Sequence, residues 1–471
     1  MGARSTTLRR AGLALWLCAL GAGCAREEPV GPAPPGPLLV VGVDGLEWDV
    51  ALPLVQAGRM PNLRSLMERG TYGKLQTTRP TSSPILWTTI ATGKDSAAHG
   101  IRGFVQDEGS GELELYDRTD RRTAAIWNMA SEHGLRTACV GWWMTFPVEE
   151  ILGVMVAQTN TEDHLPEGGT QRLWKGNLID GVPGQVHPPE RQNEMLAVLR
   201  EVDASLPELL LRIFGAFPHE LSALGEQLWS DCRWAFRADA TYLEVTERLL
   251  GEADPFDLAL VYFGGPDVVG HRFWRYLRPE LYEHPPSTRE LENLGHIVED
   301  YYVYIDEALG RLVRAAGADA TVFVLSDHGM NAVRRKEVFD AEAPPENVNS
   351  GHHAAAPPGV FLAAGPIVRA AERSLPSEVA QLETSGSIHD IAPTLLAALR
   401  IPLGRDLSGR VLTEIFRADF AIERQPRPVA THDTPAFLER QSFDGSTPGE
   451  AERLEQLRGL GYLDSEFQED E

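Results

Sequence analysis

The chain has 471 residues, of which 43% are hydrophobic and 24% charged, a globular composition long enough for one large core or two domains. Its 68 acidic residues outnumber 43 lysines and arginines, and the formal net charge is −25. A surface of that sign disfavours the backbone of a nucleic-acid polymer, which binds clusters of Lys and Arg. We therefore expect no such partner.

The first 23 residues are typical of an export signal. Arg4, Arg9 and Arg10 precede a short apolar stretch, residues 11–23, which is too short to span a bilayer. The small residues before Cys24 favour cleavage there and lipid attachment, as in a bacterial lipoprotein, and a plain secretory signal is the alternative. We expect a protein of the cell envelope, lipid-anchored or secreted, that meets the membrane only through its anchor.

A Pro/Gly-rich linker, residues 24–37, separates this signal from the expected catalytic domain, residues 38–417. Continuous apolar runs such as LLVVGV are typical of strands buried on both faces of a parallel sheet. Helical patterns alternate with these runs, which predicts a doubly wound, mostly parallel α/β sheet. Strands are expected to begin near residues 38, 137, 258, 321 and 360, and helices to cover about 60–70, 124–134 and 299–317.

Residues from about 160 to 255 depart from this alternation, because their patterns are helical with few strand candidates. We expect a helical insertion there that caps one end of the sheet, and a second excursion over residues 272–298. The C-terminal tail, residues 418–471, is polar and loosely patterned. Two cysteines of the catalytic domain, Cys139 and Cys232, form either one disulfide or two buried thiols.

Acidic side chains follow three of the expected strands. Asp44 follows the first strand, Asp267 follows the strand at 258 after a glycine turn, and Asp327 follows the strand at 321. Because ligands of open α/β sheets bind beyond the carboxyl ends of the strands, we expect the three carboxylates at one edge. Each alone is also explained as a helix N-cap, but three together would repel unless a cation is present.

Histidines accompany two of these acids. His271 lies four residues after Asp267, which places both side chains on one side of a helical turn, and His328 directly follows the third acid. A further pair, His352 and His353, lies in the loop before the strand at 360, although paired loop histidines are more often surface residues. Carboxylate oxygen and imidazole nitrogen together suit zinc.

A hydroxyl-rich segment, RPTSSPILWTTIATG at residues 79–93, offers a nucleophile. A serine beside a divalent ion loses its proton readily and can attack phosphorus without a histidine base. Ser83 is the preferred candidate, with Ser82 and Thr81 as alternatives. The simpler explanation is a turn in which Ser83 only caps a helix, although a helix start would also attract phosphate.

These motifs resemble the alkaline phosphatase superfamily and, within it, the type I phosphodiesterase/nucleotide pyrophosphatase family. The resemblance covers about residues 38–412 and rests on VVGVDG, PTSSPILWTTIATG, GPDVVGH, SDHGM and DIAPTLL, in this order. It implies an alkaline phosphatase-like sheet, two Zn²⁺ ions and a Ser or Thr nucleophile that forms a covalent phospho-enzyme.

The resemblance also implies a role for each candidate residue. One zinc would be held by Asp267, His271 and His353. The other would be held by Asp44, Asp327, His328 and Ser83. His352 is the alternative to His353, and Ser83 would also be the nucleophile.

Leu86 departs from the pattern of the family. Nucleotide pyrophosphatases often carry an asparagine at this place, which contacts a phosphoryl oxygen, so nucleotide specificity is in doubt. In sulfatases an arginine would stand here after Ser82 and Pro84, and leucine argues against that activity.

The sequence therefore predicts an exported, metal-dependent phosphoric ester hydrolase that acts on a small-molecule, lipid or glycan phosphate ester. The alternatives are a metal-dependent phosphotransferase on envelope lipids or glycans, and a non-catalytic envelope binding protein. Some tryptophans could line the substrate cleft, although most are expected to pack in the core. They are Trp87, Trp142, Trp143, Trp174, Trp229, Trp234 and Trp274.

Overall fold

The computed structural model describes residues 34–107, 113–158, 163–164, 170–171, 178, 182–333, 339–342, 347–370, 374–420, 425–435 and 437. The predicted export signal, Cys24, most of the linker and most of the tail lie outside these residues. Among the helices described, none combines the length and apolar character that a membrane span requires.

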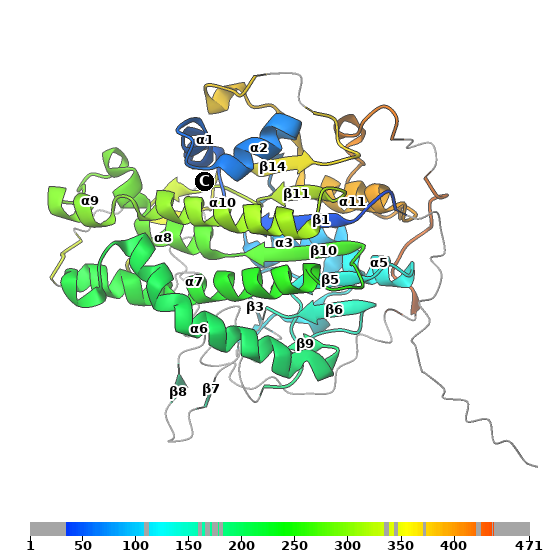
Figure 1. Ribbon diagram of the computed structural model, residues 1–471, viewed down its shortest axis with the longest axis horizontal. Helices are drawn as coiled ribbons and strands as arrows, with labels where there is room; N and C mark the ends of the chain where they lie inside the picture. The colour runs from blue at the N-terminus through cyan, green and yellow to red at the C-terminus, as the bar shows by residue number, and fades with distance from the viewer. Residues whose placement is uncertain are drawn as a thin grey trace, which may run out of the picture.

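A nine-stranded sheet forms the centre of the described fold (Figure 1). Its order is β15-β2-β14-β11-β1-β10-β5-β6-β9. Of these strands, β14 and β9 run antiparallel to their neighbours and the other seven run in one direction, which confirms the predicted mostly parallel sheet. The strands are β1 (Leu38–Val43), β2 (Gly70–Gln76), β5 (Thr137–Val140), β6 (Gly153–Val156), β9 (Val186–His187), β10 (Leu258–Phe263), β11 (Thr321–Leu325), β14 (Gly359–Ala364) and β15 (Thr384–Ser387).

Three two-stranded ribbons accompany this sheet in the described residues. They pair β3 (Val105–Asp107) with β4 (Leu113–Leu115), β7 (Asp163–His164) with β8 (Thr170–Gln171), and β12 (Asn331–Ala332) with β13 (Gly351–His352). The third ribbon matters for the site, because His353 directly follows β13.

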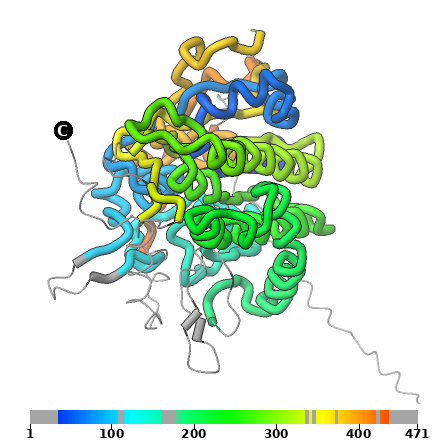
Figure 2. Tube along the Cα trace, turned by 90° about the vertical axis from the view of Figure 1, so that its left-hand side faces the viewer, coloured from blue at the N-terminus to red at the C-terminus, as the bar shows by residue number. Residues whose placement is uncertain are grey.

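Helices cover both faces of the sheet. One face shares a hydrophobic core with α1 (Trp48–Gln56), α2 (Pro61–Arg69), α6 (Gln192–Phe214), α7 (Ala223–Leu250), α8 (Gly265–Leu277) and α10 (Ile297–Ala316). The other packs on α3 (Ser83–Thr92), α5 (Ile126–Glu132) and α11 (Ile391–Leu399). The short helices are α4 (Ser96–His99) and α9 (Thr288–Leu294). Figure 2 shows the green helical segments beside one another, with the light-blue segments to their left.

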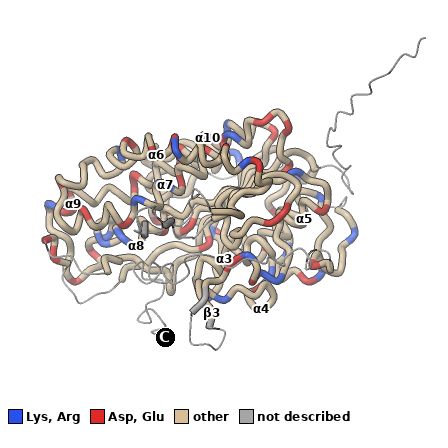
Figure 3. Tube along the Cα trace, turned by 90° about the horizontal axis from the view of Figure 1, so that it is seen from below, with Lys and Arg blue, Asp and Glu red and all other residues tan. Residues whose placement is uncertain are grey.

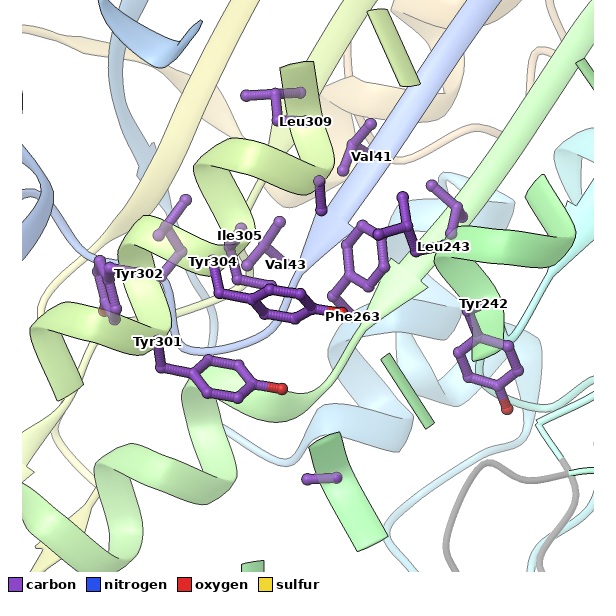
Figure 4. Close-up of a cluster of buried hydrophobic side chains, with 14 of the residues drawn as sticks. Val41, Val43, Tyr242, Leu243, Phe263, Tyr301, Tyr302, Tyr304, Ile305 and Leu309 are labelled. Carbon is purple, nitrogen blue, oxygen red and sulfur yellow. The ribbon is translucent and has the colours of Figure 1, made fainter. Parts of the chain in front are cut away.

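The central strand β1 explains why its sequence is a continuous apolar run. All six of its residues are buried, because helices cover both faces and the side chains alternate between them. Leu38 and Val40 belong to one core, and Leu39, Val41 and Val43 belong to the other. Figure 4 shows Val41 and Val43 beside aromatic and aliphatic side chains of α10.

The predicted helical insertion contains the two long helices α6 and α7. α7 lies against β10 and β5, so it covers a face of the sheet rather than only one end. Its amphipathic pattern explains this position, because Tyr242 and Leu243 are buried in the core that it shares with the sheet. The second expected excursion begins later than residue 272, since α8 continues to Leu277.

The two cysteines are both buried free thiols. Cys139 lies on β5 in one core, whereas Cys232 lies on α7 in the core of the opposite face. The disulfide alternative is therefore wrong, since the sheet separates the two sulfur atoms.

Candidate metal centre

Two groups of acidic and histidine side chains lie beyond β1, β10 and β11, at their carboxyl ends. The members of one group are Asp267, His271 and His353, and those of the other are Asp44, Asp327 and His328. Within each group the potential ligand atoms lie within 4.8 Å of one another, close enough for one ion. Since β1 lies between the parallel strands β10 and β11, acids from three distant parts of the sequence meet here.

A glycine lets the loop after β1 approach the start of α8. Gly45 has a φ of +67°, and a Cβ at this position would lie only 2.8 Å from the Cα of Asp267. The amide of Asp44 donates to the carbonyl of Phe263 at 2.9 Å. The loop after β1 and the start of α8 are thereby held together, which brings the carboxylates of Asp44 and Asp267 close to each other.

Two hydrogen bonds orient the carboxylate of Asp44. The hydroxyl of Tyr262 and the indole N–H of Trp87 both donate to its Oδ2, at 2.6 and 3.0 Å. Its Oδ1 is left 3.4 Å from Nε2 of His328. Such outer hydrogen bonds fix a ligand's orientation before a metal binds.

Two histidines are held in the tautomer that a metal requires. His271 Nδ1 lies 2.8 Å from the carbonyl of Gly351, and His328 Nδ1 lies 2.9 Å from the carbonyl of Gly329. A carbonyl can only accept, so each Nδ1 carries the proton and donates it. Nε2 of each neutral ring is then the nitrogen that can bind a metal.

The electrostatics of the centre favour a bound cation. Burial raises the pKa of Asp327 well above its usual range, and repulsion from Asp44 and Asp267 adds to this. Both carboxylate oxygens of Asp327, Nε2 of His328 and Nδ1 of His353 are buried without a hydrogen-bond partner in the described part. Buried polar atoms without partners are costly. A divalent cation would offset that cost, so this donor set fits a metal.

The structure brings His353, rather than His352, into the first group. The ring of His353 stacks on that of His328 with centroids 4.2 Å apart, and lies 5.0 Å from the ring of His271. Burial lowers its pKa well below the usual range, which favours the neutral form that binds metals. His352 lies on β13, pairs with Asn331 and is only partly buried.

The hydroxyl-rich segment also reaches this centre. The Thr81 hydroxyl donates to the main-chain oxygen of His353 at 2.5 Å. Ser83 is buried as the first residue of α3, and Ser82 is its N-cap residue. Ser82 makes no capping bond, and its Oγ is buried without a partner in the described residues. Leu86 is fully buried and has no polar atom to offer a phosphoryl oxygen.

A hollow adjoins the two groups. It is lined by Asp44, Trp143, Gln158, Trp234, Ala235, Ala238, Asp239, Tyr242, Tyr262, Gly264, Asp267 and Val268. Of the seven tryptophans named from the sequence, Trp143 and Trp234 line this hollow and also belong to the cores. Trp87, Trp142 and Trp274 are buried in the cores, and Trp229 packs against one of them. Trp174 lies outside the described residues.

Comparison with known proteins identifies the family. Residues 38–397 match the family model described as type I phosphodiesterase/nucleotide pyrophosphatase, which is most of the chain. The chain belongs to the type I phosphodiesterase/nucleotide pyrophosphatase family. The resemblance inferred from the motifs is confirmed, and with it membership of the alkaline phosphatase superfamily.

Curated relatives match a shorter part of this family member. The 2,3-bisphosphoglycerate-independent phosphoglycerate mutase of Desulforudis audaxviator is 31% identical over 170 residues, which are 36% of this chain and 26% of the mutase. The mutase of a Synechococcus strain is 29% identical over 178 residues, which are 37% of this chain and 27% of that mutase. The chain spans about a quarter of the length of these relatives.

Solved structures are similar at lower identity. Murine ectonucleotide pyrophosphatase/phosphodiesterase 5 aligns with a TM-score of 0.45 and 15% identity, over 78% of this chain and 95% of that one. Phosphonoacetate hydrolase from Sinorhizobium meliloti 1021 aligns with a TM-score of 0.41 and 18% identity, over 65% of this chain and 59% of that one. A putative sulfatase from Bacteroides thetaiotaomicron aligns with a TM-score of 0.46 and 12% identity, over 82% of this chain and 75% of that one.

No sequence pattern indicated a role for Asp239, which lies on α7. Its buried carboxylate accepts hydrogen bonds from the amides of Gly264 and Gly265, both at 3.0 Å, and from the Tyr301 hydroxyl at 2.8 Å. A Cβ on Gly265 would collide with that hydroxyl. Asp239 thus fixes the turn between β10 and α8, and this turn presents Asp267.

Glu47 was likewise not predicted. Its buried carboxylate accepts from the amide of Met330 at 2.7 Å and so ties the loop after β1 to the loop that carries Asp327 and His328. Burial raises the pKa of Glu47 to about 8. The side chain is therefore protonated in the folded protein at neutral pH.

Replacement of Asp239 by asparagine is expected to weaken metal binding at the candidate centre by about 10-fold, the effect typical of losing an outer hydrogen-bond partner. Asparagine has one acceptor oxygen for three donors, so the turn before Asp267 loosens. A zinc titration against a competing chelator measures the affinity. Tyr301→Phe is the control, because it removes one of the three bonds and should have a smaller effect. An unchanged affinity in Asp239→Asn would show that the turn holds its shape without this carboxylate.

Replacement of Glu47 by glutamine is expected to change the pH dependence of stability in metal-free protein. The folded pKa lies above the usual value, so the folded state binds the extra proton, and stability is lost as pH rises through about 8. Between about pH 6 and pH 9 the wild type should lose roughly 3 kcal/mol relative to Glu47→Gln. Urea unfolding in the presence of a chelator measures this difference. Parallel stability curves for the two proteins would contradict the raised pKa.

Proposed function

We propose that this family member is an exported phosphoric ester hydrolase with two zinc ions and the nucleophile Ser83. The observation that carries the proposal is the adjacency of the two three-residue groups. The rings of His328 and His353, one from each group, stack at 4.2 Å, so ions held by the groups would be neighbours. Paired ions suit a reaction in which an attacking and a leaving oxygen both carry negative charge.

Each group offers a donor set that suits zinc. Asp267, His271 and His353 supply one carboxylate and two imidazoles. The second group supplies two carboxylates and one imidazole, and Ser83 would complete it. When bound, the two ions would lower the pKa of the Ser83 hydroxyl and offset the charge of the phosphoryl oxygens.

In the proposed reaction, Ser83 and then a water molecule act as nucleophiles. Ser83 Oγ gives up its proton and attacks phosphorus from the side opposite the leaving alcohol. The Oγ–P bond forms while the bond from phosphorus to the alcohol oxygen breaks, and the alcohol takes up a proton. Water then attacks the phosphorylated serine, the Oγ–P bond breaks, and Ser83 recovers its proton.

Leu86 cannot contact a phosphoryl oxygen. We assign this contact to the Ser82 hydroxyl and the Ser83 amide in the same segment. Ser82 Oγ is buried and without a partner among the described residues, and the amide of Ser83 lies at the start of α3. Pro84 has no N–H to contribute. These two donors would replace the asparagine expected of a nucleotide pyrophosphatase.

The proposed substrate is a small-molecule, lipid or glycan phosphate ester of the cell envelope, reached by a protein that a lipid on Cys24 anchors there. A phosphotransferase is the second candidate, and the similarity to phosphoglycerate mutases over 36% of the chain favours it. In that reaction an acceptor hydroxyl would take the place of water at the phosphorylated serine.

The Ser83→Ala variant tests the nucleophile. After zinc reconstitution, its turnover of bis-p-nitrophenyl phosphate and p-nitrophenyl phosphate should fall by at least about 10³-fold, because no other hydroxyl takes its place. The metal content should remain close to that of the wild type. Release of p-nitrophenol and elemental analysis measure the two quantities.

Ser82→Ala and Thr81→Val serve as matched controls within the same segment. They keep the serine at 83, so phosphoenzyme formation should persist in both, and only the rate should change. An active Ser83→Ala together with an inactive Ser82→Ala would transfer the role to Ser82. A zinc-loaded wild type that hydrolyses neither ester and transfers phosphate to no alcohol would leave the binding-protein alternative.

A further inference from the structure

Helix α8, which carries two of the metal-ligand candidates, also carries two buried arginines. Arg272 and Arg275 follow the ligand candidate His271 on α8, and only 2% and 3% of their surfaces are exposed. Arginine is almost never buried to this extent unless it is paired. Figure 3 shows basic segments beside α8.

Neither of the two forms an ion pair within the part of the chain that the structure describes. Nε of both residues, and Nη1 of Arg275, are buried without a hydrogen-bond partner there. Arg275 uses Nη2 to donate to the carbonyl of His284 at 3.1 Å and lies 4.1 Å from the centre of the Phe339 ring. By contrast, the equally buried Arg121 pairs with Glu149 at 2.5 Å.

The missing negative charge requires a physical explanation. A buried cation without an ion-pair partner loses its hydration, and the contacts of Arg275 with His284 and Phe339 do not neutralise its charge. Guanidinium groups bind planar and tetrahedral oxyanions through paired N–H donors. An oxyanion from a ligand would supply both the charge and the acceptors that Arg272 and Arg275 lack.

Arg272 and Arg275 lie on the same helix as Asp267, the metal-ligand candidate at which the phosphate would react. Val268, one helical turn before Arg272, lines the hollow together with Asp44 and Asp267. From the helix rise, Arg272 and Arg275 lie roughly 7 and 12 Å beyond Asp267 along the axis.

We propose that Arg272 and Arg275 bind a second anionic group of the substrate, a carboxylate or phosphate separated from the reacting phosphorus by several bonds. This rests on the proposed phosphoric ester hydrolase and narrows its substrates to esters that carry a second negative charge. The two arginines are then specificity residues, and the reacting phosphate remains at the metal groups.

A matched pair of substrates tests the assignment. One is the p-nitrophenyl phosphodiester of hexanol, and the other is that of 6-hydroxyhexanoic acid, whose carboxylate reaches the distance of Arg272. The wild-type, zinc-loaded protein should show kcat/KM about 10- to 100-fold higher for the carboxylate ester. In Arg272→Gln and Arg275→Gln this ratio should fall towards one.

Arg237→Gln is the control, because Arg237 pairs with Asp203 on the surface of the helical insertion and its loss should leave the substrate ratio unchanged. A wild-type ratio of one overturns the proposal without any variant, so misfolding of a variant cannot hide a failure. If, in addition, sulfate raises the melting temperature of wild type but not of Arg272→Gln, the pair binds a free oxyanion instead. Hydrolysis of neither ester would instead count against the proposed function.

Discussion

The crowding of three buried carboxylates at one edge of the sheet is the constraint on which the rest of the site depends. Asp44, Asp267 and Asp327 are each nearly inaccessible to water, and both burial and mutual repulsion raise the pKa of Asp327. Without a positive partner, such a cluster would be strongly destabilising once ionised. The histidines in both groups offer nitrogen donors that a cation can bind, so a bound cation is the natural partner of the carboxylates.

The fold holds this unfavourable arrangement in place through contacts from several layers. Tyr262 and Trp87 orient Asp44 from the strand and from α3. Asp239, which lies on the helical insertion, holds the start of α8. The insertion therefore stabilises the site and also lines the hollow beside it. Glu47 joins the two loops that carry the second group. Contacts from the sheet, from α3 and from the helical insertion thus together hold the ligand candidates in place.

The parts of the site that the sequence predicted share one physical origin. Strands buried on both faces are continuous apolar runs, and an acid just after such a run lies at the carboxyl edge. Asp44 and Asp327 could therefore be placed from the sequence alone. His353 could not be separated from His352, because the choice depends on how β13 turns. β2 was missed, since GTYGKLQ has mixed polarity. Asp239 and Arg272 lie within helical patterns, where only tertiary contacts reveal that they are buried.

The number of zinc ions that the folded chain binds tests the central claim most directly. Purified wild-type protein can be stripped of metal, reconstituted with zinc, freed of excess ion and analysed by plasma mass spectrometry. Two ions per chain are expected, because the two three-residue groups are separate donor sets in contact with each other. Fewer than one ion per chain would contradict the two-metal centre and, with it, the proposed chemistry at Ser83.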